Sequence, residues 1–278
     1  MIEIKLPISA IVFTKNEALN IVECIQSLSW FDEILVIDSC SNDDTKSMAA
    51  DMGAQTIDFA WNGQYPKKRQ WSLENVKFRN PWILFVDADE RVTEELVNEL
   101  RSFLNLDSPN FDAGSIPIDY YFAGKQLRYG QRPRKTVLLK LGKVNFPEVD
   151  DLAADGMGEL EGHYQPIVAG KVRKFSSKIR HNDNDQISTW MLRHVNYAKW
   201  EAYLLIHNDV KRKVDQSKGK AVSIFHKLPF RPLSFFLYSY ILKFGFLDGK
   251  AGFDYAFAKS WYYWLSQVIA EENLRDDK

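Results

Sequence analysis

The chain has 278 residues and a net charge of -1, with 45% apolar and 26% charged residues, as in ordinary globular proteins. This nearly neutral balance argues against a nucleic-acid-binding surface over the whole molecule, so we expect no nucleic-acid partner. The two cysteines, Cys24 and Cys40, are too few for a disulfide framework or a metal cluster, which favours the cytoplasm. Residues 7–13 are too short for a signal-peptide core and are interpreted as a strand.

Short apolar runs alternate with helical patterns over the first half of the chain. Strands are predicted at residues 8–13, 34–37, 55–59 and from 82, and a helix is predicted after each, from residues 17, 45, 67 and 93. This alternation predicts an α/β fold with a mostly parallel sheet and helices on both faces. The sequence contains neither of the usual glycine-rich phosphate loops, so charged side chains would have to hold the phosphates of a nucleotide.

The fourth apolar run, from residue 82, ends in two acids, Asp87 and Asp89. In open α/β sheets, ligands bind beyond the carboxyl ends of the strands. Two carboxylates there suit Mg²⁺ or Mn²⁺, which takes one or two protein carboxylates together with phosphate oxygens. The alternative interpretation is that the two acids only end a strand and begin the helix after it.

Charged side chains follow the other strands as well. Lys67, Lys68 and Arg69 open a predicted helix, where cations oppose the helix dipole and therefore indicate an anion; the alternative is a solvated helix start. Glu17 and Asp38 each follow a strand and are positioned either to accept hydrogen bonds from a base or ribose or to cap the next helix.

Three motifs together resemble family 2 glycosyltransferases of the GT-A fold, especially the bacterial branch of lipopolysaccharide-core glucosyltransferases. They are TKNE at residues 14–17, VIDSCSNDDT at 36–45 and LFVDADER at 84–91. The resemblance extends over about the first 120 residues and implies a nucleotide-sugar site, with a UDP-sugar as the favoured donor. It implies these positions: Thr14 and Glu17 near the base and ribose, Asp38 on a uracil-like edge, Lys68 and Arg69 toward the donor, and Asp87 and Asp89 at the metal-bound diphosphate.

Strand-like patterns return at residues 111–129 and 137–141, where the resemblance implies the acceptor half. Direct displacement needs a general base there, because the acceptor hydroxyl loses its proton as it attacks. The candidate bases are Asp150, Asp151, Asp155, Glu159 and Glu161. We favour Glu161 and then Glu159, which lie two residues apart and share a face if extended.

Two histidines bear on this assignment. Relatives often have His-Glu near residue 163, whereas Tyr164 follows His163 in this chain. His181 falls where many proteins of the fold carry a histidine that reaches the metal, and the alternative is a purely structural role.

The last third of the chain is predicted to be helical. A helix with one buried face begins at Ser188, and residues 211–220 are interpreted as a basic linker. The apolar, aromatic run at residues 233–247 is too short to span a bilayer. With its surrounding cations it predicts a hairpin of amphipathic helices in a membrane interface, or alternatively a layer packed on the catalytic domain or on another subunit. These cations are Lys227, Arg231, Lys243, Lys250 and Lys259.

The predicted organisation is a GT-A domain at residues 1–185, with a nucleotide-sugar half (1–110) and an acceptor half (111–185), followed by a helical region at 186–278. The predicted activity is inverting transfer from a nucleotide diphosphate sugar, with Mn²⁺ or Mg²⁺, to a lipid-linked, lipopolysaccharide or exopolysaccharide acceptor. Residues 225–270 are expected to contact the inner face of the cytoplasmic membrane peripherally. The alternatives are a nucleotidyltransferase and a non-catalytic, membrane-associated nucleotide-binding scaffold.

Overall fold

The computed structural model describes residues 4–106, 108–131, 133–161, 164–181, 186–217 and 230–276. Within these ranges a nine-stranded sheet has the order β3-β2-β1-β4-β9-β6-β13-β5, with β12 paired to β6. The strands of its first half are parallel: β1 (Leu6–Thr14), β2 (Phe31–Asp38), β3 (Gln55–Asp58) and β4 (Trp82–Asp87). The predicted α/β class, a mostly parallel sheet flanked by helices and followed by a C-terminal helical extension, is confirmed.

The second half of the sheet mixes strand directions. β9 (Arg134–Lys140) runs antiparallel to both β4 and β6 (Ala113–Asp119). The edge is built from β13 (Ile179–His181), which pairs parallel with β6 and antiparallel with β5 (Glu90–Val92), and from β12 (Val172–Lys174). Two small hairpins lie outside the sheet: β7 (Tyr121–Phe122) with β8 (Lys125–Gln126), and β10 (Val144–Asn145) with β11 (Ile167–Val168).

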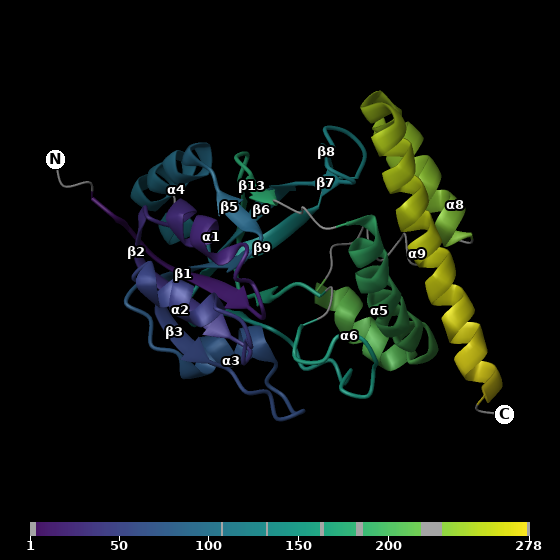
Figure 1. Ribbon diagram of the computed structural model, residues 1–278, viewed down its shortest axis with the longest axis horizontal. Helices are drawn as coiled ribbons and strands as arrows, with labels where there is room; N and C mark the ends of the chain where they lie inside the picture. The colour runs from purple at the N-terminus through teal and green to yellow at the C-terminus, as the bar shows by residue number, and fades with distance from the viewer. Residues whose placement is uncertain are drawn as a thin grey trace.

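Helices of the first half accompany the parallel strands, and Figure 1 shows them gathered around this end of the sheet. They are α1 (Ile21–Ser27), α2 (Thr45–Asp51), α3 (Lys68–Asn75) and α4 (Glu94–Leu106), the last followed by the 3₁₀ turn η1 (Ser108–Asn110). The central strands are buried on both faces, which explains their unbroken apolar runs. Helix α1 begins later than predicted, because Glu17 belongs to a turn whose backbone N–H donates to Thr45 Oγ1 at 2.8 Å.

The C-terminal helices form a layer at the other end of the molecule, with α8 and α9 side by side and far from the parallel strands β1 to β4 (Figure 1). This layer contains α5 (Ile187–Ile206), α6 (Asn208–Ser217), α8 (Arg231–Phe236), the π-helical η2 (Leu237–Leu242), the 3₁₀ turn η3 (Gly245–Asp248) and α9 (Gly249–Asp276). Among the described residues, no helix has the length and apolar content needed to cross a bilayer.

Two predictions for this region need correction. Residues 211–217 belong to helix α6, because Val210 and Val214 supply a buried face that joins the main hydrophobic core; residues 218–220 lie outside the described part of the chain. Arg231 does not face outward, since it is 3% exposed and pairs with Glu201 at 2.5 Å. Lys227 lies outside the described residues. The domain boundary at residue 185 stays a prediction, although α5 adds Trp200 to the core of the sheet domain.

Candidate functional site

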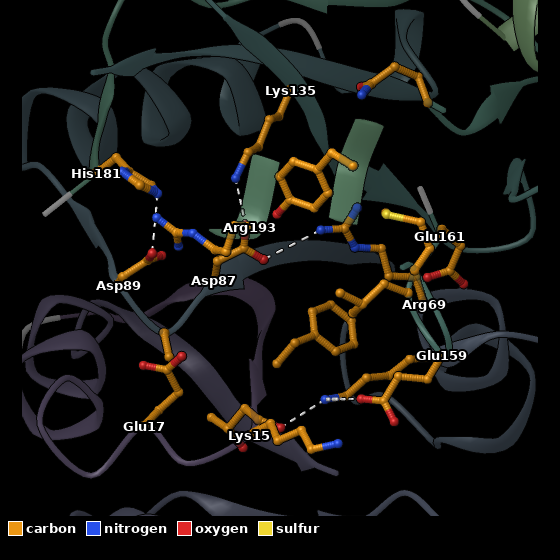
Figure 2. A pocket seen from close by; sticks show the side chains of 18 residues that line it. Lys15, Glu17, Arg69, Asp87, Asp89, Lys135, Glu159, Glu161, His181 and Arg193 are labelled. Carbon is orange, nitrogen blue, oxygen red and sulfur yellow. Dashed lines mark hydrogen bonds and ion pairs between the residues drawn. The ribbon is translucent and has the colours of Figure 1, made fainter. Parts of the chain in front are cut away.

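A cavity of about 440 Å³ opens at the carboxyl ends of the central parallel strands. Because β1, β2 and β4 are parallel, the side chains that follow them meet at one edge of the sheet. Figure 2 shows charged groups from distant parts of the chain converging here. The sequence-predicted residues that line it are Thr14, Glu17, Lys68, Arg69, Asp87, Asp89, Glu159, Glu161 and His181.

Asp87, at the end of β4, lies between two cations (Figure 2). Its carboxylate oxygens lie 2.6 Å from Lys135 Nζ and 3.4 Å from Arg69 Nη2. Burial would raise the pKa of Asp87, but the charges of Lys135 and Arg69 outweigh it and hold this pKa well below its usual range. The two neighbouring cations therefore favour the ionised form of Asp87.

Lys135 also reaches Glu90, at 2.6 Å, and so joins two of the acids that follow β4. Glu90 is 1% exposed, and burial raises its pKa above the ordinary value. The antiparallel register pairs Trp82 with Lys140 and Leu84 with Leu138, and its continuation along both strands brings Lys135 beside Asp87.

Asp89 faces His181 across the pairing of β5 with β13 (Figure 2). His181 Nε2 lies 3.2 Å from Asp89 Oδ2. Burial opposes the charged form of both side chains, but their mutual hydrogen bond and attraction prevail, which raises the pKa of His181 and lowers that of Asp89. Asp89 Oδ1 and His181 Nδ1 are buried and have no hydrogen-bond partner in the described structure.

These unpartnered atoms bear on whether the site fits a divalent cation. Among the described residues there is no cluster of three or more His, Cys, Asp or Glu that would hold a metal alone. A buried carboxylate oxygen without a partner, next to a second carboxylate, does fit a cation that completes its shell with phosphate oxygens. The donor set therefore suits Mg²⁺ or Mn²⁺ together with a diphosphate, rather than a metal cage made of protein alone.

Asp38 has a different position from the other predicted residues, because it does not line the cavity. It is fully buried and accepts hydrogen bonds from Thr14 Oγ1 at 2.8 Å and from the Ser41 backbone N–H at 2.7 Å. It therefore fixes the loop after β2. Glu17 does line the cavity, and its Oε2 accepts a hydrogen bond from Asn20 Nδ2 at 2.8 Å.

The three cations at the start of α3 have separate roles. Lys68 Nζ donates to the Thr14 carbonyl at 2.9 Å, and burial lowers its pKa to about 8. Arg69 points into the cavity (Figure 2). The expectation that Lys67 faces the phosphates is wrong, because Lys67 is 1% exposed and pairs with Asp151 at 2.8 Å.

The loop at residues 150–161 brings both favoured base candidates to the cavity. Glu159 accepts a short hydrogen bond from Ser39 Oγ and lies 3.9 Å from Lys68 Nζ. Glu161 is 4% exposed, accepts a hydrogen bond from the Gln70 backbone N–H at 2.9 Å, and its Oε2 has no partner in the described structure. Burial raises the pKa of Glu161.

The other base candidates lie elsewhere. Asp150 and Asp155 do not line the cavity. Asp151 is buried and fully engaged: besides Lys67, it accepts hydrogen bonds from Tyr65 Oη at 2.6 Å and from Trp200 Nε1 at 2.9 Å. Asp151 thus anchors the loop to α3 and α5.

Comparison with protein families gives a match to glycosyl transferase family 2 over residues 9–153, which is more than half of the chain and includes the acids after β4. The chain belongs to this family. The sequence-based assignment, made on three short motifs, is confirmed.

Similar proteins differ in how much of the chain they match. An uncharacterized glycosyltransferase of Rickettsia felis is 42% identical over 95 residues, which cover 34% of this chain and 32% of the relative. The chain thus spans about a third of the length of this relative. The lipopolysaccharide core biosynthesis glycosyltransferase LpsC of Rhizobium meliloti is 27% identical over 271 residues, 91% of this chain and 90% of LpsC.

Among solved structures, glucosyl-3-phosphoglycerate synthase of Mycobacterium tuberculosis, crystallised with Mn²⁺, UDP and glucosyl-3-phosphoglycerate, is 25% identical. The similarity covers 40% of this chain and 43% of that enzyme, with a TM-score of 0.33. A score this low does not allow the ligands of that enzyme to be transferred to this chain.

Sequence reasoning missed several cavity residues of this family 2 chain, among them Lys15, Lys135, Arg193 and Tyr197. Lys15 lies within the TKNE motif and was open to detection there. Arg193 was also detectable, because it interrupts the aromatic face that Trp190 and Tyr197 form on α5. Lys135 has no local signal, since only strand register brings it to Asp87.

Proposed function

We propose that this chain is an inverting, metal-dependent glycosyltransferase that moves a sugar from a UDP-sugar to a hydroxyl of a lipid-linked or lipopolysaccharide-type acceptor. One observation carries the proposal: in a family 2 chain, Asp87 and Asp89 share a cavity with Lys68 and Arg69. The similarity to LpsC over 91% of the chain supports the acceptor class.

The donor diphosphate would lie between the cations and the acids. Asp87 and Asp89 would hold the divalent ion, with His181 beside them. A divalent cation bound there offsets the charge that develops on the departing diphosphate. Lys68 and Arg69 bind the phosphate oxygens from the other side. Burial lowers the pKa of Lys68, and a phosphate anion next to it would raise this pKa again and keep Lys68 charged. Thr14 and Glu17 lie toward the base and ribose.

Glu161 is our choice for the general base. The acceptor oxygen attacks the anomeric carbon while the bond from that carbon to the diphosphate oxygen breaks, and the hydroxyl proton passes to Glu161. The raised pKa of Glu161 makes its carboxylate a stronger proton acceptor, as a general base requires. Glu159 is less suited, because it is bound to Ser39 on the nucleoside side.

Peripheral membrane contact belongs to the same proposal. The segment from η2 to η3 exposes large apolar side chains, including Leu242 (68%), Phe244 (56%) and Leu247 (54%). The exposed Lys243 lies among them. An apolar surface that carries a cation suits the interface of an anionic bilayer, where a lipid-linked acceptor resides.

The experiment that tests the activity combines a panel of UDP-sugars, screened by thermal shift with Mn²⁺, with the variant Asp89→Ala. We expect one UDP-sugar to stabilise the protein, wild-type enzyme to release UDP, and Asp89→Ala to lose transfer while keeping the wild-type melting curve. The control, Asp51→Ala, removes an exposed acid at the end of α2 and should keep full activity.

Three results would count against the proposal. Unchanged turnover in Asp89→Ala contradicts the metal role. Release of diphosphate from a nucleoside triphosphate favours a nucleotidyltransferase. Failure of all UDP-sugars to bind in the presence of Mn²⁺ favours a non-catalytic scaffold.

A further inference from the structure

A second cleft, of about 310 Å³, lies next to the donor cavity. The two spaces share three lining residues, His181, Arg193 and Tyr197. A molecule bound in this second cleft would therefore adjoin the donor sugar. None of the sequence patterns pointed to it.

Two helices that pack against each other form its walls. Helix α9 contributes Tyr255, Lys259 and Tyr263, which are spaced four residues apart and so lie on one helix face. Helix α5 contributes side chains three or four residues apart, which also lie on one helix face: Trp190, Arg193, His194 and Tyr197.

Tyr120, which follows β6, closes the end of this aromatic cleft. Its hydroxyl accepts a hydrogen bond from Trp190 Nε1 at 2.8 Å, and its ring centroid lies 5.2 Å from that of Tyr255. Aromatic walls with a few polar groups are typical of sites that bind organic ligands, because the rings supply contact area and the polar groups fix orientation. Tyrosine hydroxyls and ring nitrogens also match the hydroxyl groups of a saccharide.

The cleft is positively charged. Its described lining contains the cations Arg193 and Lys259 and no carboxylate. Lys259 Nζ lies 4.7 Å from the centroid of the Tyr262 ring and forms no ion pair within the described residues. Burial lowers the pKa of Lys259; Glu201 of α5 is the acid that raises this pKa electrostatically, and Glu201 forms its own ion pair with Arg231.

We propose that this cleft binds the acceptor saccharide and selects one that carries a phosphate or carboxylate group, held by Lys259 and Arg193. The inference rests on the proposed function and specifies its acceptor. Cationic side chains bind such anions through short, charge-assisted hydrogen bonds, and the aromatic rings pack against the sugar. The anionic group lies at the α9 wall, and a hydroxyl of the same saccharide faces the donor cavity past His181 and Tyr197.

The test measures ligand-observed NMR titrations at pH 7 with glucose, glucose 6-phosphate, glucuronate and inorganic phosphate. We expect both anionic sugars to bind at least about tenfold more tightly than glucose, and more tightly than phosphate alone. Lys259→Met should remove this preference and Lys259→Arg should retain it. The matched control is Lys250→Met on the same helix, because Lys250 is exposed and pairs with Asp254 at 2.5 Å; it should behave as wild type.

Equal binding of glucose and glucose 6-phosphate would overturn the proposal, as would an equal preference in Lys259→Met and wild type. Phosphate alone binding as tightly as glucose 6-phosphate would remove the saccharide part of it. Melting curves of each variant verify folding. UDP binding with Mn²⁺ is measured on the same samples and separates the two proposals. If the protein binds anionic sugars but does not bind UDP, only the proposed function is contradicted. If it binds UDP but does not bind anionic sugars, only this inference is contradicted.

Discussion

The sheet half and the C-terminal helical layer distribute their side chains in opposite ways. In the sheet half most large apolar residues are buried, and charges gather at the carboxyl edge of the strands, where Lys135 and Arg69 neutralise Asp87. In the layer, Leu242 and Phe244 are exposed, whereas Arg231 is buried. The core of the sheet is completed by its own helices and by side chains of α5 and α6 such as Trp200 and Val214, whereas the outer surface of the layer exposes apolar side chains suited to another molecule.

The loop at residues 150–161 connects these two regions. Asp151 ties it to Lys67 at the start of α3 and to Trp200 of α5, and the same loop carries Glu161 into the cavity. The loop thus contacts both α3 and α5 and holds Glu161 at the cavity between them.

The largest expected effect is on catalysis and follows the substitution Glu161→Gln. If Glu161 is the base, kcat falls roughly 100- to 10,000-fold while UDP affinity is unchanged. In the wild type, kcat should decrease as the pH falls through the raised pKa of Glu161, because protonation removes the base. Glu159→Gln is the control and should weaken UDP binding rather than abolish turnover, since Glu159 contacts Ser39 and Lys68. A Glu161→Gln enzyme with normal kcat rules out this assignment.

The next largest effect is expected on stability and follows the substitution Asp151→Asn, which removes the ion pair between Asp151 and Lys67. Both partners of the Lys67–Asp151 pair are at most 1% exposed, so an uncompensated buried ammonium should reduce the free energy of unfolding by roughly 3–5 kcal/mol. Urea denaturation measures this change. Asp155→Asn removes an exposed acid of the same loop and should change little. Similar stabilities of the two variants would show that the pair does not hold the regions together.

Membrane contact is tested by the double substitution Leu242→Ser and Phe244→Ser in the layer. Each lost apolar side chain should lower partitioning onto anionic vesicles about tenfold, as measured by co-sedimentation, because less apolar surface leaves water. Leu106→Ser, at an exposed position of α4 in the sheet half, is the matched control. If both variants bind vesicles as the wild type does, the exposed surface of the layer serves some other partner.

A smaller effect is expected from Gly156→Ala, which moves the loop away from α5. Gly156 has φ +97°, and a Cβ there would overlap the backbone carbonyl of Asn196. Strain of this kind costs about 1–2 kcal/mol, and the overlap should also displace Glu161 and lower kcat. Gly158→Ala is the control, because Gly158 also has positive φ (+51°) but a Cβ there would contact only Trp61, at 3.6 Å. Equal kcat values for the two variants would show that the position of the loop does not affect activity.

The first half of the fold was predictable because its signals are local. The apolar run of β4 and the helical spacing of α4 both depend on burial of neighbouring positions, and both elements lie where expected. Strand β5 was not predicted, since three residues beginning with Glu90 carry no periodicity, and its partner β13 lies about 90 residues later. Helix α6 was interpreted as a linker because its charged residues conceal a narrow buried stripe.

The sequence by itself determined the family, the parallel α/β half and many of the charged residues that line the first cavity, because parallel strands bring their carboxyl ends to one edge whatever their exact register. Only the tertiary structure decided what surrounds those residues. The antiparallel pairings of β9 with β4 and of β13 with β5 bring Lys135 to Asp87 and His181 to Asp89. The packing of α9 on α5 forms the second cleft. Contacts between such distant segments depend on register and helix packing, which leave no local pattern in the sequence.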